Sequence, residues 1–345
     1  MSSEGKRLFI VTVILIFASL SLFIYINYPG TPSSKRTSFM LNTTVSVQAF
    51  GENAEKAVNE SMNRLQEIEN LMSTTLENSD IYRINKNTGQ EVKVHPDTLE
   101  VIKRSITFAR DTDGKLDPGI GPLVELWGFR SDNPGVPDKN KIQNTKKLVD
   151  YKEIEIDQTN NTVKIKPGMS LDLGATAKGY AAEEVKKIIT EHGIESAFID
   201  LGGHIQAIGK KIDGQLWNVG IQDPRIGYNT PIGSLKINDR NVVTSGEYER
   251  YFKENNSYYH HIIDPSTGKP ADKGLKSVTI ITDDSFKADA LSTGLFVMKL
   301  EKGLDFIENI DNTEAIFITD ERKVYLSSGI KNDFIIRGPD YILAN

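Results

Sequence analysis

Hydrophobic and polar positions follow two periods along the chain, and together they predict both strands and helices. Residues 42–50 alternate Thr, Val and Ser with other residues, which is typical of a strand. Residues 54–71 instead repeat apolar positions at helical spacing, with acidic residues on the other face. The apolar positions of this predicted helix are Ala57, Val58, Met62, Leu65, Ile68 and Leu71.

The same reading extends to the rest of the chain. We predict helices at 98–109 and 288–298, and strands at 197–201, 217–221, 235–237 and 277–281. Residues 149–165 predict a strand pair that turns at Asn160 and Asn161, and residues 170–173 a short strand that meets Gly174. A helix follows it, with apolar positions at Ala177, Ala181, Val185 and Ile188. Non-alternating strands mixed with helices predict an α+β fold rather than a doubly wound sheet.

The N-terminal segment follows neither period. Residues 8–27 contain no charged side chain and are long enough to cross a ~30 Å hydrocarbon core as a helix. Lys6 and Arg7 precede them, which predicts that residues 1–7 are cytoplasmic and that the rest of the chain lies outside. A cleaved signal peptide is the alternative. No small-x-small cleavage site follows Ile26, so an uncleaved transmembrane signal anchor is favoured.

The next residues complete the predicted domain organisation. Residues 28–38 hold two prolines, a glycine and several Ser and Thr residues, which indicates a linker. Residues 39–345 then form one extracytoplasmic domain with a substantial core.

Composition excludes several classes of protein. The chain has 41 Lys and Arg against 47 Asp and Glu, a net charge of −6, so the basic surface of a nucleic-acid-binding protein is missing. It has no cysteine, which excludes disulfides, thiolate nucleophiles, cysteine-ligated zinc and a lipid anchor on cysteine.

The predicted helix at 288–298 carries a candidate metal site. Asp289 and Thr293 lie four residues apart, so a helix places both on one face, with Ser292 beside them. A carboxylate and a hydroxyl are oxygen ligands that suit Mg²⁺, whose remaining positions are filled by waters or substrate phosphates. The structural alternative is that Asp289 caps a helix and Thr293 bonds to its own backbone.

Two glycine-containing turns are candidates for binding a phosphate or a flat ligand. In Asp172 to Tyr180 a strand ends in glycine and a helix begins, so backbone N–H groups and Lys178 can face a phosphate. Gly202 and Gly203 allow a ligand to approach the backbone closely. Either turn can equally be an ordinary connection between elements.

A histidine next to a proline-rich turn is the candidate general base. His261 precedes the turn of residues 264–270, and histidine titrates near neutral pH. A purely structural histidine is the alternative. The sequence contains no P-loop, no complete dinucleotide fingerprint, no His-Glu-x-x-His and no Gly-x-Ser-x-Gly.

Seven segments, taken in order, resemble the ApbE-type FAD:protein FMN transferases. The resemblance extends from Phe39 to at least Met298. The segments are Phe39 to Val45, Leu116 to Phe129, Asp172 to Tyr180, Asp200 to Gly203, Thr244 to Tyr251, His261 to Pro270 and Ala288 to Thr293.

The resemblance implies an α+β enzyme outside the cytoplasmic membrane that binds FAD with Mg²⁺. It implies transfer of FMN from FAD to a Thr or Ser of an exported acceptor protein that carries a flavinylation motif, with release of AMP. His261 would be the catalytic residue. The implied FAD contacts are Met40, Asp117, Pro118, Asp172, Lys178, Gly203, Ser245, Gly246 and Ile263. The implied metal ligands are the Ala175 carbonyl, Asp289 and Thr293, with Ser292 as a further ligand.

Two departures from the family pattern keep other functions open. Thr74 stands where the family often has an aromatic residue that stacks on the cofactor, and Asn42 where glycine is common. One alternative is a Mg²⁺-dependent FAD pyrophosphatase that gives FMN and AMP. Another is a non-catalytic flavin-binding surface protein, although binding alone needs neither His261 nor the pair of Asp289 and Thr293.

Overall fold

A computed structural model describes residues 30–345 except 226, 228–229 and 272–273. The predicted signal anchor at 8–27 and the cytoplasmic segment at 1–7 lie outside the described residues. Within residues 30–345, apart from those gaps, no helix combines the length and apolar character needed to cross a membrane.

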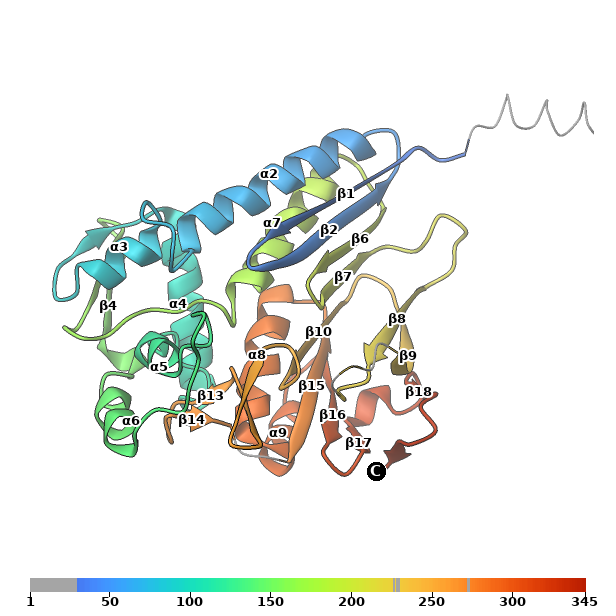
Figure 1. The fold of residues 1–345 in the computed structure, drawn as a ribbon. Helices are drawn as coiled ribbons and strands as arrows, with labels where there is room; N and C mark the ends of the chain where they lie inside the picture. Colours follow the sequence, from blue (N-terminus) through green and yellow to red (C-terminus); the bar gives the residue numbers. More distant parts are fainter. Residues whose placement is uncertain (1–29, 226, 228–229, 272–273) are drawn as a thin grey trace, which may run out of the picture.

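A nine-stranded sheet runs through the part of the chain that the structure describes. Its strand order is β1-β2-β6-β7-β10-β15-β16-β17-β19, antiparallel except for the pair β17 and β19 (Figure 1). The bounds are β1 Ser33–Met40, β2 Thr43–Phe50, β6 Ser196–Leu201, β7 His204–Ile208, β10 Asn241–Gly246, β15 Leu275–Thr282, β16 Thr313–Thr319, β17 Lys323–Leu326 and β19 Ile342–Leu343.

Helices cover one face of this sheet. Figure 1 shows α2 and α7 beside β1, β2 and β6, and α8 and α9 beside β15 and β16. The bounds are α2 Ala54–Met72, α3 Asp80–Lys86, α4 Pro96–Asp111, α5 Gly121–Trp127, α6 Lys139–Lys146, α7 Ala177–Glu191, α8 Ser285–Met298 and α9 Leu300–Glu308. Short 3₁₀ turns lie at Tyr151–Glu153 and Ser328–Ile330.

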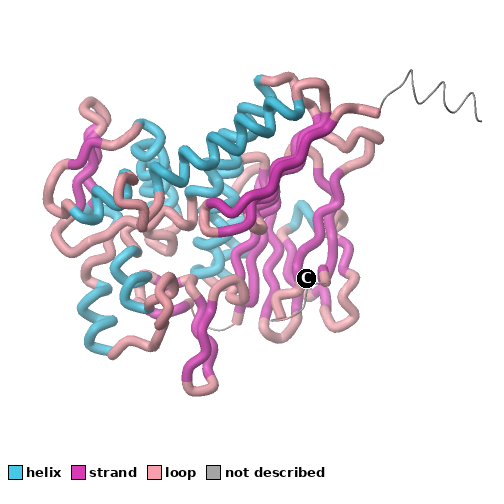
Figure 2. Tube along the Cα trace, turned by 45° about the horizontal axis from the view of Figure 1, so that its top comes forward, coloured by secondary structure: helices cyan, strands magenta, loops and turns pink. Residues whose placement is uncertain are grey.

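Smaller sheets complete the fold. A three-stranded sheet of β8 Trp217–Gln222, β9 Pro231–Ile237 and β18 Ile335–Ile336 covers the other face of the large sheet, and another joins β3 Val92–Lys93, β5 Thr162–Ile165 and β4 Ile154–Asp157. Two short ribbons follow β10: β11 Tyr251–Glu254 with β12 Ser257–His260, and β13 Ile263–Asp264 with β14 Lys269–Pro270 (Figure 2).

Alternation along the central strands builds a core on each face of the large sheet. Val243 and Ile280 pack in the cluster under α8, whereas Val242 and Ile281 pack in the cluster against the β8-β9-β18 sheet. Successive side chains of a strand point to opposite faces, so one strand serves both cores. This explains why these strands read as continuous apolar runs, and it confirms the α+β prediction.

The structure corrects one predicted boundary and one predicted strand. The predicted linker at 28–38 contains most of β1, since Ser33–Met40 pairs with β2 along its whole length. The exposed Ser, Lys and Thr side chains of this edge strand made it look like a linker. The predicted strand at 170–173 was also wrong, because Ser170 makes only an isolated bridge to Ile120. Most of the predicted helices and strands are present, with ends shifted by a few residues.

Candidate active site

The candidate site begins where the first turn of α7 meets α8. The Gly179 N–H donates to Asp289 Oδ2 at 2.9 Å, so a carboxylate from α8 caps the N-terminal end of α7. A Cβ at Gly179 would lie 2.7 Å from the Cα of Phe286 and 2.9 Å from the Cβ of Asp289. Glycine at this position therefore permits the close approach of the two helices that brings Asp289 to the end of α7.

Asp289 is buried and held as a carboxylate. Lys178 Nζ lies 3.6 Å from its Oδ1, and the positive end of the α7 dipole faces the same group. Burial alone raises the pKa of Asp289, but Lys178, His204 and the Gly179 N–H outweigh it and lower the pKa to about 2. The site therefore presents a fixed negative charge at neutral pH.

Three hydroxyl groups gather at the turn of α8 that follows Asp289. Ser245 Oγ lies 2.8 Å from Ser292 Oγ and 3.2 Å from Thr293 Oγ1, so the end of β10 meets α8 at these side chains. Ser292 Oγ also donates to the Asp289 carbonyl at 2.8 Å. The predicted ligands Asp289, Ser292 and Thr293 thus come from one helix, and Ser245 joins them from a strand.

The backbone before α7 adds a further oxygen. Among the described residues no N–H donates to the Ala175 carbonyl, because Gly179, four residues later, donates to Asp289 instead. Ala175 packs near Ala290, the neighbour of Asp289 in the chain. One carboxylate, two hydroxyls and a free carbonyl are the hard oxygen donors that Mg²⁺ takes, so these residues fit such an ion. No group of three His, Asp or Glu in the described ranges could hold a metal.

His204 lies next to Asp289. The sequence pattern did not predict this residue as part of the site. It is 1% exposed, and its Nε2 hydrogen-bonds with Ser285 Oγ at 2.7 Å. Its Nδ1 has no hydrogen-bond partner and lies 3.7 Å from Asp289 Oδ1, a distance that makes the contact electrostatic rather than a hydrogen bond. The imidazole thus fixes the orientation of the carboxylate through the start of α8.

His261 is placed as a neutral base. Its Nδ1 lies 3.3 Å from the Arg250 carbonyl oxygen, and its backbone N–H donates to the same oxygen at 3.0 Å. A carbonyl can only accept, so Nδ1 carries the proton and Nε2 keeps its lone pair. Burial, the charge of Arg250 and the neighbouring His260 lower the pKa of His261 to about 3, so it is unprotonated at neutral pH.

Arg250 connects the base to the hairpin at the edge of the large sheet. Its Nη2 donates to the Asn42 carbonyl at 3.0 Å. Burial and the nearby charge of Arg130 lower the pKa of Arg250, whereas Glu249 and Asp172 oppose this change. Glu249 is exposed to solvent but has protein atoms around it. The hydration that these atoms displace raises its pKa to about 7, although Lys178 and Arg250 act against this shift.

Asp172 is buried beside Arg130. Arg130 Nη1 lies 2.6 Å from Asp172 Oδ2, and the Gly174 N–H donates to Oδ1 at 2.8 Å. Arg130 Nη1 also donates to Thr74 Oγ1 at 3.1 Å. A guanidinium therefore contacts the position at which the sequence lacks an aromatic residue.

Asp117 and Pro118 hold the backbone around Asp172. The Asp117 carboxylate accepts the N–H groups of Gly119 at 2.7 Å and Tyr151 at 3.0 Å, and the Pro118 carbonyl accepts the Asp172 N–H at 2.8 Å. Burial raises the pKa of Asp117 to about 6 against these hydrogen bonds. Both carboxylate oxygens of Asp117 accept hydrogen bonds from the backbone, so its contacts support a structural role.

The remaining predicted contacts frame the site or lie in its walls. Met40 is buried at the end of β1, just before a turn in which Leu41 and Asn42 have φ of 52° and 59°. Asparagine tolerates this conformation, which explains Asn42 where glycine is common. An added Cβ at Gly203 meets no atom within 4 Å, so the backbone there is open to a ligand.

Two further predicted residues pack against protein. A Cβ at Gly246 would lie 2.4 Å from the Tyr248 ring, so the absence of a side chain makes room for that ring. Ile263 is buried in a cluster with Leu123, Trp127 and Ile142. Four other residues escaped prediction because their partners are distant in the chain. They are Arg130, His204, Glu249 and Arg250.

A family model and curated relatives match most of the chain. The model described as the ApbE family matches residues 41–317. The FAD:protein FMN transferase of Treponema pallidum is 32% identical over 314 residues, 86% of this chain and 87% of its own length. The FAD:protein FMN transferase of Klebsiella pneumoniae is 37% identical over 262 residues, 75% of this chain and 81% of its own.

Solved structures match the fold as well. The ApbE protein of Thermotoga maritima has a TM-score of 0.78 and 34% identity, with 83% of this chain and 94% of that chain covered. The flavin transferase ApbE of Vibrio cholerae has a TM-score of 0.78 and 28% identity, with 88% of this chain and 100% of that chain covered.

Proposed function

The chain belongs to the ApbE family and transfers flavin from FAD to a target protein, and we propose that the acceptor is a Thr or Ser hydroxyl. We further propose that the reaction depends on Mg²⁺ and releases AMP. The observation that carries the proposal is a neutral His261, with its proton fixed on Nδ1, near the Asp289 carboxylate. The charge of Lys178 acts on both side chains.

His261 would act on the acceptor. Nε2 takes the proton of the hydroxyl as its oxygen attacks the phosphorus on the FMN side of the diphosphate. A phosphoester bond to the acceptor forms. The bond between the FMN phosphorus and the bridging oxygen breaks, and AMP leaves with that oxygen. The imidazolium that results is stabilised by the Arg250 carbonyl, which accepts from Nδ1 at 3.3 Å.

Asp289, Thr293, Ser292 and the Ala175 carbonyl would hold the Mg²⁺ ion. When bound, this ion neutralises charge on the diphosphate and orients it. Lys178 lies beside the same carboxylate and can place its ammonium against a phosphate oxygen. The backbone at Gly203 is open to the flat flavin, and the family resemblance implies further FAD contacts at Met40 and Asp172.

We also propose that the domain is exported and anchored by residues 8–27. The support is the uncharged run of these residues, with Lys6 and Arg7 before it. The acceptor would then be an exported protein with a Ser or Thr flavinylation motif, on the same side of the membrane.

The test is the intact mass of an acceptor. The full chain, purified in detergent, is incubated with FAD, Mg²⁺ and purified exported Ser/Thr-motif proteins from the same cell. We expect a mass gain of one FMN phosphoester, AMP in equal amount and no reaction with EDTA. Free FMN and AMP with unmodified acceptors would instead identify an FAD pyrophosphatase. Intact FAD with every acceptor would contradict catalysis and favour flavin binding alone.

A further inference from the structure

A hollow lies next to the candidate site and has no part in the chemistry described above. Its volume is about 530 Å³, within the range of ~300–1,000 Å³ usual for binding pockets. Aromatic and apolar side chains make up much of its wall, with charged groups at intervals. The residues that line it include Glu247, Tyr251, Tyr258, His260 and Lys276.

The ribbon of β11 and β12 forms one wall of this hollow. It projects from the body of the molecule (Figure 2), and no third strand pairs with it in the part of the chain that the structure describes. Tyr251 and Tyr258 are 39% and 51% exposed, with ring centroids 5.6 Å apart. Two exposed tyrosines on a ribbon with free edges are typical of a surface that binds another chain.

The other face of the same ribbon is fixed to the protein. Phe252 and Tyr259 lie on it, with ring centroids 6.4 and 5.7 Å from that of Trp127. Trp127 is buried, and its indole N–H donates to the Gly268 carbonyl at 2.9 Å. Because one face is anchored, the tyrosines on the other face are presented in a defined orientation.

The hollow is continuous with the catalytic region through three segments of the chain. Glu247 follows Gly246, Tyr251 follows Arg250, and His260 precedes His261. Consecutive Cα atoms are ~3.8 Å apart, so the wall of the hollow begins where the catalytic region ends. A chain lying along the edge of β12 toward His260 would therefore reach His261 at the end of the strand.

We propose that this surface binds an extended segment of the acceptor protein next to the modified Ser or Thr. The surface consists of the hollow and the edge of β12, with Tyr251 and Tyr258. The inference rests on the proposed function, in which a polypeptide hydroxyl must reach His261. A free strand edge supplies backbone hydrogen bonds to an extended segment, and alternate side chains of that segment enter the hollow. Lys178 and Gly203, the FAD contacts proposed above, do not line the hollow, which leaves it available to the second substrate.

The experiment compares the rate of flavinylation with the affinity for FAD. Wild-type full chain, FAD and Mg²⁺ first label an extract of exported proteins, and the band with the strongest flavin fluorescence is identified by mass and purified as the acceptor. Kinetics with that protein are then measured for wild type, Tyr258→Ala, the double variant Tyr251→Ala/Tyr258→Ala, and Ile212→Ala. Ile212 is 60% exposed and lies outside the hollow, so it is the matched control.

We expect kcat/KM for the acceptor to fall about tenfold or more in the double variant, as truncation of interface tyrosines commonly does. The dissociation constant of FAD, from quenching of flavin fluorescence, and the unfolding midpoint should stay at their wild-type values, and Ile212→Ala should match wild type throughout.

Other outcomes separate this inference from the proposed function. An unchanged kcat/KM in the double variant would overturn the docking surface while transfer itself stands. Weaker FAD binding with an unchanged acceptor KM would also overturn it, because the hollow would then serve FAD. If wild type labels no protein, the proposed acceptor chemistry fails, and the docking surface that rests on it is overturned with it.

Discussion

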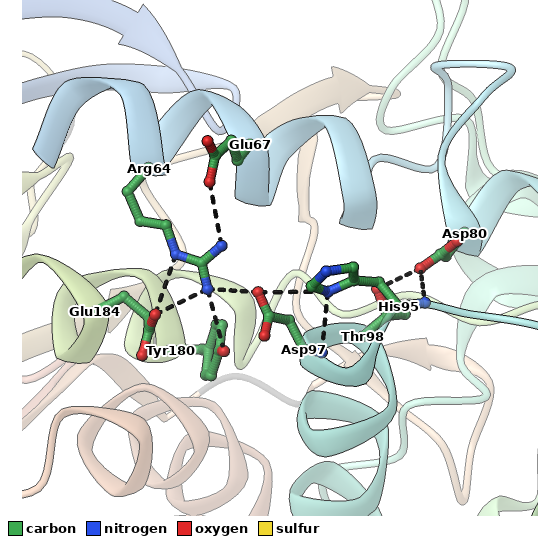
Figure 3. A network of polar contacts seen from close by, with 8 residues as sticks. All are labelled: Arg64, Glu67, Asp80, His95, Asp97, Thr98, Tyr180 and Glu184. Atoms are coloured by element: carbon green, nitrogen blue, oxygen red, sulfur yellow. Dashed lines mark hydrogen bonds and ion pairs between the residues drawn. The ribbon is translucent and has the colours of Figure 1, made fainter. Parts of the chain in front are cut away.

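Two groups of charged side chains meet α7, and they differ in how completely their charges are matched. On one side Arg64 of α2 donates to Glu184 through Nε at 3.1 Å and Nη2 at 2.8 Å, and it contacts Asp97 at the start of α4 and Glu67 within α2 (Figure 3). Burial lowers the pKa of Arg64, but Asp97 and Glu184 outweigh it and raise the pKa above its usual value.

The other group surrounds the first turn of α7. Asp289 has Lys178 and His204 as partners, yet His261 is held neutral and Arg250 faces the like charge of Arg130. The pKa of Glu249 is raised because the protein around this exposed side chain displaces part of its hydration, which disfavours its charge. Arg64 thus lies among acids that satisfy it, whereas several groups of the site lie in surroundings that disfavour their charged forms.

This difference in charge matching indicates the role of each group of side chains. Matched charges join α2, α4 and α7 and need nothing further, which suits a scaffold. Disfavoured charges are typical of sites where a substrate supplies the missing interactions. The two groups should therefore respond in opposite ways to substitution: one in stability, the other in turnover.

Asp289→Asn gives the largest expected effect. It keeps the shape of the side chain but removes the charge that Lys178 and the Gly179 N–H surround, and with it the proposed metal ligand. We expect no measurable flavin transfer and no heat of Mg²⁺ binding by calorimetry, under conditions where denaturant unfolding shows that the variant is folded. Asp97→Asn is the matched control and should keep full turnover. Normal transfer by Asp289→Asn would show that the metal assignment is wrong.

His261→Gln should lower turnover by about 10²–10⁴-fold, the usual contribution of a general base. The affinity for FAD should change only a few-fold, because the amide fills most of the space of the ring. Single-turnover transfer and flavin fluorescence titration measure the two quantities separately. Equal losses in both would mean that His261 binds FAD or supports the site instead of acting on the acceptor.

His204→Phe tests how the metal carboxylate is oriented. The ring keeps its volume but loses both the hydrogen bond to Ser285 and the nitrogen that faces Asp289. We expect Mg²⁺ affinity to fall about 10–100-fold, as is usual when a group that orients a metal ligand is removed. His192→Phe is the control, since His192 pairs with Glu60 away from the site and should leave Mg²⁺ affinity unchanged. Unaltered metal binding by His204→Phe would assign His204 to packing alone.

Arg64→Met tests the scaffold. It leaves Asp97 and Glu184 without their shared partner, and we expect a loss of about 1–3 kcal/mol in the free energy of unfolding, as for a hydrogen-bonded charge that loses its partner. Transfer under conditions where the protein is folded should stay within about threefold of wild type. Denaturant unfolding and initial rates measure the two effects. A large loss of turnover without a loss of stability would contradict the division between the two groups.

The sequence predicted the long periodic elements and the local part of the site. The helices at 54–71, 98–109 and 288–298 have unbroken apolar positions, so their existence followed from the sequence. Asp289 and Thr293 share a face for the same reason. The exposed edge strand β1 was missed, because polar side chains on an edge resemble those of a linker.

The rest of the site depends on contacts between distant segments. Gly179 and Asp289 are 110 residues apart, and no local pattern in either helix shows that they meet. His204 and Ser285 come together only because β7 pairs with β10 and β10 with β15, which leads into α8. Pairings of this kind follow from tertiary packing, so the roles of His204, Arg130 and Arg250 could not be read from spacing.

The smallest effect concerns the pH dependence of stability. The pKa of His261 is about 3 in the folded protein against ~6.5 in the unfolded chain, so only the unfolded chain binds this proton between these values. The free energy of unfolding therefore falls as the pH drops through 6.5 toward 3. From pH 6.5 to pH 5 the loss is at most about 2 kcal/mol, because one pKa unit is worth about 1.4 kcal/mol and the ring is only partly buried.

His261→Gln should remove that part of the slope, while Glu249→Gln should change it in the opposite direction. The raised pKa of Glu249 stabilises the fold below its unfolded value, and this contribution is lost as the pH rises through about 7. In the scaffold, Arg64→Met should lower stability by a similar amount at pH 5 and pH 7, since the pKa of Arg64 is raised far above that range. Denaturant unfolding at both pH values measures all three. If the two site variants keep the wild-type slope, the site carries no disfavoured charge and the contrast with the scaffold fails.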